Sequence, residues 1–138
     1  MEKIALLTDS ACDIDEETIN KYNINILSFR IIYGNGEYID KVEITPKEVY
    51  DNMKMEIPKS SLPSMEYMEK IYKKFEEENY THVIAVVISS GLSGTYNALK
   101  IISEKHKNLS TYIYDSKSTS VGEGIILKEC GKLIKQSK

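Results

Sequence analysis

An uninterrupted apolar run from Val83 to Ile88 restricts the fold of this chain more than any other feature. The run is short for a helix, and the polar loop Ser89–Thr95 follows it at once. A strand without alternating polar residues is buried on both of its faces. Such strands belong to parallel sheets that helices cover on both sides. We therefore expect an α/β fold with a mostly parallel sheet and helices on both faces.

Strands and helices alternate along the rest of the chain. Further strands are predicted over Lys3–Thr8, Asn25–Tyr33, Glu37–Asp40 and Ser110–Tyr114. Helices are predicted over 14–22, 46–55, 64–75, 96–106 and 121–136, with a non-helical segment over 57–63. Thr45 with Glu48 matches a capping box. Asp13 with Glu16 matches another, and Ser64 is a third expected N-cap.

Composition argues against several classes of function. The chain has 18 Lys and Arg against 21 Asp and Glu, a net charge of −3, whereas nucleic-acid binders carry a basic surface. No apolar run approaches the roughly 20 residues of a spanning helix. The first apolar stretch is too short for the core of a signal peptide. Cys12 and Cys130 are expected to be reduced, structural thiols of a cytoplasmic protein.

Three polar loops follow predicted strands of the parallel sheet: Asp9–Asp13, Ser89–Thr95 and Asp115–Ser120. Ligands of open α/β sheets bind beyond the carboxyl ends of the strands, so these loops are the expected place for a site. All three are rich in hydroxyl groups and poor in bases.

Gly91 and Gly94 stand at a predicted helix start beside Ser93 and Thr95. The spacing lacks the lysine of a P-loop and the third glycine of a dinucleotide fingerprint. The first N–H groups of a helix are nevertheless unpaired and electropositive, so this position suits a carboxylate or another oxyanion. The alternative is that Ser90 or Ser93 only caps the helix.

Other chemistries fit the sequence less well. Gly91–Thr95 lacks the last glycine of a serine-hydrolase elbow. His82 begins a strand at the end opposite the loops, and both it and His106 are expected at the surface or at its boundary. Two histidines also exclude a multi-histidine metal site, and no metal or other cofactor is expected.

The aspartates of the loops have two interpretations. Asp9, Asp13 and Asp115 could gather a metal at one edge of the sheet. We favour the other, in which Asp13 caps a helix and Asp9 or Asp115 orders a loop. The hydroxyl-rich segment Lys59–Ser64 is likewise either a loop before a cap or a second set of donors for the oxyanion at Ser93.

Several stretches together resemble the DegV family of bacterial fatty-acid-binding proteins. They occur in the order of the family and cover essentially the whole chain: TDSACD (8–13), VEITPKEVY (42–50), KSSLPS (59–64), ISSGLSGTYNA (88–98) and DSKSTSVGEG (115–124). The resemblance implies a protein that holds a long-chain fatty acid in an apolar tunnel. It also implies that the protein catalyses nothing, and that it presents the carboxylate to the separate ATP-using subunit of a fatty acid kinase.

The resemblance also implies which residues bind the ligand. The hydroxyl of the family's carboxylate-binding threonine falls on Ser60, and its second ligand on Ser93, an identical match. Ser61 is a weaker candidate, and Gly94 allows close approach of the backbone. Leu62 stands where the family has glutamine, which alters the polarity of the tunnel mouth.

Family members carry a second α/β domain that closes the tunnel and supplies further charge near the carboxylate. Residues 1–138 resemble a single N-terminal domain, so the second is expected to be absent from this chain, and fatty acid binding is expected to be impaired in this half-length form. An exposed inter-domain face would favour a homo-dimer. The competing hypothesis is a small α/β enzyme that acts on a phosphorylated or carboxylated metabolite with Asp9, Ser93 and Asp115.

Overall fold

The computed structural model describes residues 1–137, and its centre is a parallel sheet. Four strands lie in the order β2-β1-β6-β7, and every neighbouring pair is parallel. Their bounds are Ile4–Asp9 for β1, Ile24–Leu27 for β2, His82–Val87 for β6 and Ser110–Asp115 for β7. The apolar run thus forms an inner strand, as the sequence predicts.

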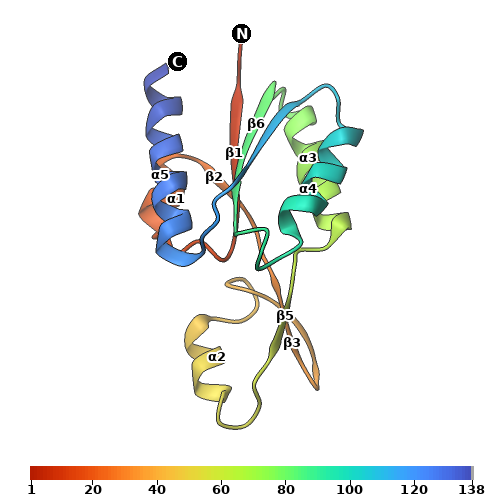
Figure 1. Ribbon diagram of the computed structural model, residues 1–138, viewed down its shortest axis with the longest axis vertical. Helices are drawn as coiled ribbons and strands as arrows, with labels where there is room; N and C mark the ends of the chain where they lie inside the picture. Colours follow the sequence, from red (N-terminus) through yellow and green to blue (C-terminus); the bar gives the residue numbers. More distant parts are fainter. Residues whose placement is uncertain (138) are drawn as a thin grey trace.

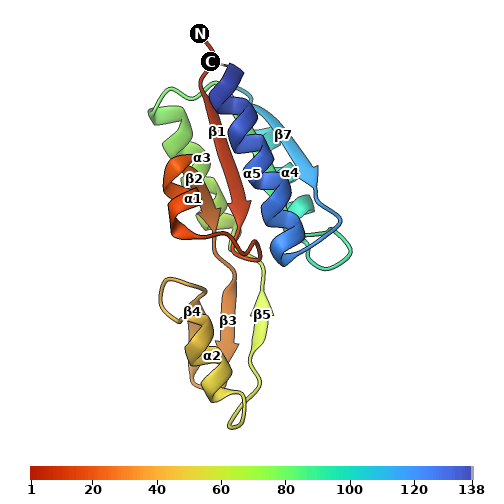
Figure 2. The same ribbon diagram turned by 90° about the vertical axis from the view of Figure 1, so that its left-hand side faces the viewer.

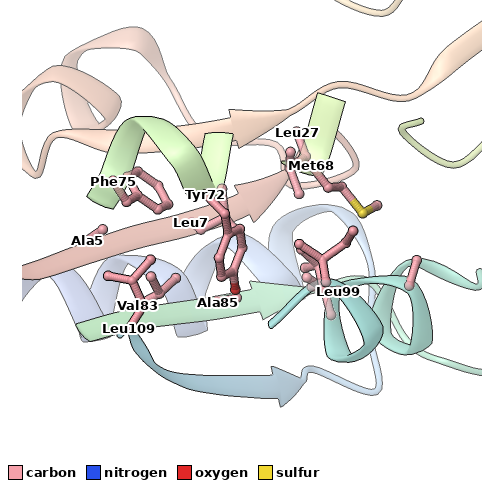
Figure 3. Packing of buried hydrophobic residues seen from close by; sticks show 13 residues of the cluster. Ala5, Leu7, Leu27, Met68, Tyr72, Phe75, Val83, Ala85, Leu99 and Leu109 are labelled. Atoms are coloured by element: carbon pink, nitrogen blue, oxygen red, sulfur yellow. The ribbon is translucent and has the colours of Figure 1, made fainter. Parts of the chain in front are cut away.

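Helices cover both faces of this sheet (Figures 1 and 2). Helices α3 (Met65–Glu77) and α4 (Thr95–Lys105) lie on one face, and α1 (Glu16–Lys21) and α5 (Ser120–Ser137) on the other. Alternate residues of β1 divide between the two cores: Leu7 packs with Met68 and Tyr72, whereas Leu6 packs with Leu127. Figure 3 shows the first of these cores, which is the larger.

A second, smaller sheet projects beyond the carboxyl ends of the parallel strands (Figure 2). It is antiparallel, in the order β4 (Gly36–Ile39), β3 (Arg30–Tyr33), β5 (Lys59–Ser61), and helix α2 (Pro46–Asn52) belongs to the same unit. The predicted hairpin is confirmed, since Tyr33 pairs with Gly36. The sequence pattern does not predict this sheet as a separate unit.

The prediction of one strand over Asn25–Tyr33 is wrong. The segment breaks between Leu27 and Arg30, so that β2 joins the large sheet and β3 the small one. Ser10 bonds to both sides of the break: its Oγ accepts from the N–H of Phe29 at 2.9 Å, and its N–H donates to the carbonyl of Leu27 at 3.0 Å.

Two of the three predicted caps are present. Thr45 and Glu48 form the capping box, and Ser64 Oγ accepts from the N–H of Tyr67 at 3.1 Å. The third prediction is wrong: Asp15, not Asp13, caps α1, and its Oδ1 accepts from the N–H of Thr18 at 2.7 Å.

Both cysteines are free, and burial raises the pKa of the Cys12 thiol to about 12, which makes that thiol unreactive at neutral pH. Across residues 1–137, no helix has both the length and the apolar character needed to cross a membrane.

His106 is buried, contrary to the expectation of a surface position. It ends α4 and lies between two glutamates of α3, with Nε2 2.8 Å from Glu69 Oε1 and Nδ1 3.1 Å from Glu76 Oε1. The imidazole therefore fastens α4 to α3 on the outer side of the core.

Replacing His106 with Leu is expected to lower the free energy of unfolding by about 1–3 kcal/mol, because the contacts of the imidazole nitrogens with Glu69 and Glu76 are lost and water compensates only in part. Chemical denaturation measures the change. His82→Leu is the control, since His82 contacts its neighbour Thr81 at the far end of the sheet. An equal loss in both variants would contradict the role of His106.

Candidate functional site

A cavity of about 480 Å³ lies where the small sheet meets the carboxyl edge of the parallel sheet. Its volume is within the range of about 300–1,000 Å³ that is usual for small-molecule sites. All four predicted ligand residues line it: Ser60, Ser61, Ser93 and Gly94. The remaining wall is mostly apolar and consists of Ala11, Phe29, Ile31, Asp40, Leu62, Ile88 and Leu92.

The start of α4 forms the polar end of this cavity. Gly94 is the N-cap of α4 and makes no side-chain cap hydrogen bond, so neither Ser90 nor Ser93 is the N-cap residue. Ser93 Oγ lies beside this end, 2.9 Å from Thr95 Oγ1, and accepts from the N–H of Thr95 at 3.3 Å. The N-cap residue itself supplies no side-chain acceptor, so the remaining N–H groups of the first turn stay electropositive and attract an anion.

Gly94 has no structural need to be glycine. Its φ is −78°, and a Cβ built on it meets no atom within 4 Å. The absence of a side chain therefore leaves space on the cavity side of the helix start, where a ligand can approach the backbone.

Strand β5 supplies the opposite side of the cavity. Ser60 pairs with Ile31 and Ser61 with Arg30, and successive strand residues point to opposite faces. The hydroxyl of Ser61 is already engaged, because Arg30 Nη2 donates to it at 3.0 Å. Within residues 1–137 the hydroxyl of Ser60 makes no hydrogen bond, which leaves it available to a ligand.

A buried acid holds the two loops that frame the cavity. Asp9 accepts from the N–H of Ala11 at 3.1 Å and from the N–H of Ile88 at 2.8 Å, and both residues line the cavity.

Glu123 of α5 is also fully buried and accepts from Thr8 Oγ1 at 3.0 Å. Burial, together with the interaction with Asp9, raises the pKa of Glu123 to about 9, so Glu123 is protonated at neutral pH.

This proton makes stability depend on pH. The native state keeps a proton on Glu123 that the unfolded chain releases above pH 4.5, so the free energy of unfolding falls as pH rises from there to about 9. Glu123→Gln keeps a hydrogen-bond donor at this position and removes the ionisable carboxyl group. Between pH 6 and pH 8 we expect wild-type stability to fall by about 1–3 kcal/mol more than that of the variant. Urea denaturation at each pH measures this, with the exposed Glu129→Gln as control. Parallel pH profiles for wild type and Glu123→Gln would contradict it.

Asp115 and Asp13 lie at the same edge but do not reach into this cavity. Asp115 accepts from the hydroxyl and N–H of Ser90 and from the N–H of Lys117, and the bond from the Ser90 hydroxyl is the main reason why its pKa is lowered. Asp13 contacts the hydroxyl of Ser120 and Lys41 instead of capping a helix. The interpretation of Asp9 and Asp115 as loop-ordering residues therefore holds.

The enzymatic alternative gains no support from this arrangement. Neither Asp9 nor Asp115 lines the cavity beside Ser93, and the carboxylates of both accept backbone donors. Among the described residues, no three His, Cys, Asp or Glu side chains are placed to hold a metal ion.

Sequence reasoning misses much of the apolar wall. The sequence pattern places Phe29 and Ile31 in a single long strand, and only the break after Leu27 brings them to the cavity. Sequence reasoning also misses the structural role of Lys41. Its Nζ donates to the carbonyls of Ser10 at 2.8 Å and Cys12 at 3.2 Å, which ties the small sheet to the loop after β1.

The comparisons with known proteins agree on one family. The profile described as "Uncharacterised protein, DegV family" matches residues 3–138. A DegV domain-containing protein of Clostridium acetobutylicum is 59% identical over 138 residues, which are 100% of this chain and 49% of the relative. A second protein of that organism is 54% identical, with the same coverage. The chain thus spans about half the length of the curated relatives it matches.

Solved structures agree with this result. DegV, a fatty acid binding protein from Bacillus subtilis, has a TM-score of 0.92 and 25% identity, over 99% of this chain and 49% of that one. A fatty acid binding DegV family protein from Streptococcus agalactiae has a TM-score of 0.89 and 29% identity, over 99% of this chain and 49% of that one. A stearic acid-binding protein from Eubacterium ventriosum has a TM-score of 0.85 and 28% identity, over 99% of this chain and 48% of that one. The sequence motifs, the fold and these matches together show that the chain belongs to the DegV family.

Proposed function

We propose that this chain binds a long-chain fatty acid, with the carboxylate between the hydroxyls of Ser60 and Ser93 at the start of α4. The observation that carries the proposal is the cavity that brings β5 and the α4 N-terminus together. Ser61 is the weaker candidate, because its side chain stands on the opposite face of β5 from Ser60 and its oxygen accepts from Arg30.

The chemistry of the cavity suits such a ligand. A carboxylate removed from water needs several donors, and here two hydroxyls and the electropositive helix start provide them. Gly94 leaves room for the carboxylate beside the backbone. The wall beyond the hydroxyls is apolar, with Phe29, Ile31 and Leu62, and takes the acyl chain.

The relatives support the same ligand class, since three similar structures are described as fatty acid or stearic acid binding proteins. The role that fits is binding without catalysis, in the cytoplasm, with delivery of the carboxylate to the ATP-using subunit of a fatty acid kinase. Neither histidine stands beside Ser93 as a base: His82 begins β6 at the opposite end, and His106 lies between Glu69 and Glu76.

Lipid extraction tests the proposal. Mass spectrometry of solvent extracts of the purified protein should find co-purified long-chain fatty acid, and calorimetric titration of stripped protein with palmitate should saturate. Sedimentation alongside the titration tests the prediction that two copies pair over an open face. Extracts without fatty acid, together with a titration that does not saturate, would contradict the proposal.

Gly94→Ala is expected to weaken ligand binding without changing the stability of the fold. The added methyl group meets no protein atom within 4 Å, so the melting temperature should stay within about 2 °C of wild type, whereas palmitate affinity should fall by about tenfold, because the methyl group occupies ligand space. Thermal denaturation and calorimetry measure the two effects. Gly91→Ala, in the same loop but outside the cavity, is the control. Unchanged affinity in Gly94→Ala would place the ligand elsewhere.

A further inference from the structure

Thr95 is a buried neighbour of Ser93, one of the two proposed carboxylate ligands. It is the first residue of α4, and it is fully buried. Its Oγ1 lies 2.9 Å from Ser93 Oγ, and its N–H donates to the same oxygen at 3.3 Å. Ser93 lines the cavity, whereas Thr95 does not. Thr95 can therefore act on a ligand only through Ser93.

Burial decides which of these two hydroxyls donates to the other. Within residues 1–137, the Thr95 hydroxyl has no hydrogen-bond partner other than Ser93 Oγ. If Ser93 donated to Thr95, the proton of Thr95 would be buried without an acceptor, which is costly away from water. If Thr95 donates, its own proton is satisfied and the proton of Ser93 remains for the cavity. The second arrangement is therefore the favoured one.

This arrangement makes Ser93 a donor toward the cavity. A hydroxyl group has one proton and two acceptor sites. The two acceptor sites of Ser93 Oγ are taken, one by the N–H of Thr95 and one by its hydroxyl. What Ser93 offers a ligand is then its proton alone. A carboxylate suits this donor, because an ionised carboxylate only accepts hydrogen bonds.

Ser60 differs from Ser93 in this respect. Its hydroxyl makes no hydrogen bond within residues 1–137, so its proton rotates freely until a ligand orders it. The N–H of Ser93 donates to the carbonyl of Ser89 at 3.2 Å, and its hydroxyl is held by Thr95. Of the two proposed ligands, Ser93 is thus the one whose donor is oriented before the ligand arrives.

We propose that Thr95 is a positioning residue for the carboxylate: its hydroxyl donates to Ser93 Oγ and thereby directs the Ser93 proton into the cavity. The two bonds in series also polarise each other, which strengthens the bond from Ser93 to the ligand. This inference rests on the proposed function. It gives a role in binding to a residue that does not touch the ligand.

Thr95→Val tests this role, because valine resembles threonine in shape and lacks the hydroxyl. Calorimetric titration with palmitate should give an affinity about three- to tenfold below that of wild type, the effect of one neutral hydrogen bond. Thr95→Ser restores the hydroxyl and should bind within about twofold of wild type. Wild-type affinity in Thr95→Val would overturn the inference and leave palmitate binding itself in place.

Thr111→Val is the matched control for this substitution. It removes a threonine hydroxyl that contacts Tyr72 Oη at 3.3 Å, and Thr111 lies outside the cavity. Palmitate affinity should therefore stay at the wild-type value. A loss in Thr111→Val as large as that in Thr95→Val would contradict a role specific to Thr95.

A double-mutant cycle separates positioning from a purely structural role. In Ser93→Ala there is no proton to direct, so adding Thr95→Val should lower the affinity by less than about twofold. In Ser60→Ala the Ser93 hydroxyl remains, and Thr95→Val should keep its full effect of about three- to tenfold. Equal effects in both backgrounds would show that Thr95 only supports the start of α4, and would overturn the inference.

Neutron crystallography of the ligand-free protein provides an independent measurement. The deuterium of Thr95 should lie between the two oxygens, and that of Ser93 should point into the cavity. A Ser93 deuterium directed at Thr95 Oγ1 would overturn the inference. If wild type failed to bind palmitate while both deuterium atoms lay as expected, the proposed function would be wrong, and with it the role of Thr95 in carboxylate binding, although the orientation of the hydroxyl would stand.

Discussion

Replacing Ser60 and Ser93 together with alanine is expected to weaken palmitate binding by roughly a hundredfold to ten-thousandfold, because each hydrogen bond to a charged carboxylate contributes about 1.5–3 kcal/mol. The single variants should each lose about ten- to hundredfold. Calorimetric titration measures all three. The fold should be unaffected, since Ser60 is exposed and Ser93 is only half-buried.

Two serine variants serve as controls. Ser61→Ala removes a hydroxyl that Arg30 already engages, and Ser103→Ala removes one that donates to the carbonyl of Lys100 far along α4. Both should keep palmitate affinity within about threefold of wild type. If the Ser60/Ser93 double variant also stayed within that range, these hydroxyls would not hold the carboxylate.

The second large effect concerns stability. Asp9→Ala is expected to lower the free energy of unfolding by about 2–4 kcal/mol, because the N–H groups of Ala11 and Ile88 lose a charged acceptor in a buried place. Removal of a buried negative charge offsets part of the loss. Urea denaturation at pH 7 gives the value.

Asp51→Ala, an exposed aspartate of α2, is the control and should change stability by less than about 0.5 kcal/mol. Asp9→Asn, which retains one acceptor, should fall between wild type and Asp9→Ala. A stable Asp9→Ala protein that had lost turnover of an ester or a phosphate would instead point to the enzymatic alternative.

The parallel sheet is predictable because its signal is local. The run Val83–Ile88 has no polar position, and such a strand requires cover on both faces. The capping box of Thr45 is equally local, since cap and partner lie three residues apart.

The small sheet is not predictable, because distant residues create it. Ser10, which bonds to both sides of the break after Leu27, is far away along the chain. Strand β5 contains Lys59, Ser60 and Ser61, which have little strand propensity and become a strand by pairing with β3.

The prediction of Asp13 as the cap of α1 fails for the same reason. Asp13 has a glutamate three residues later, but Ser120 and Lys41 take up its carboxylate. The cavity contains both residues that the sequence singles out and residues that it does not. The motifs single out Ser60 and Ser93, and both line the cavity, whereas Phe29 and Ile31 reach it through the break that the sequence does not reveal.

A crystal structure with palmitate tests the central claim most directly. The account predicts a carboxylate oxygen about 2.5–3.0 Å from Ser60 Oγ and from Ser93 Oγ, with the first methylenes against Phe29 and Leu62. A palmitate carboxylate bound away from both hydroxyls, with the Ser60–Ser93 cavity holding only solvent, would contradict it.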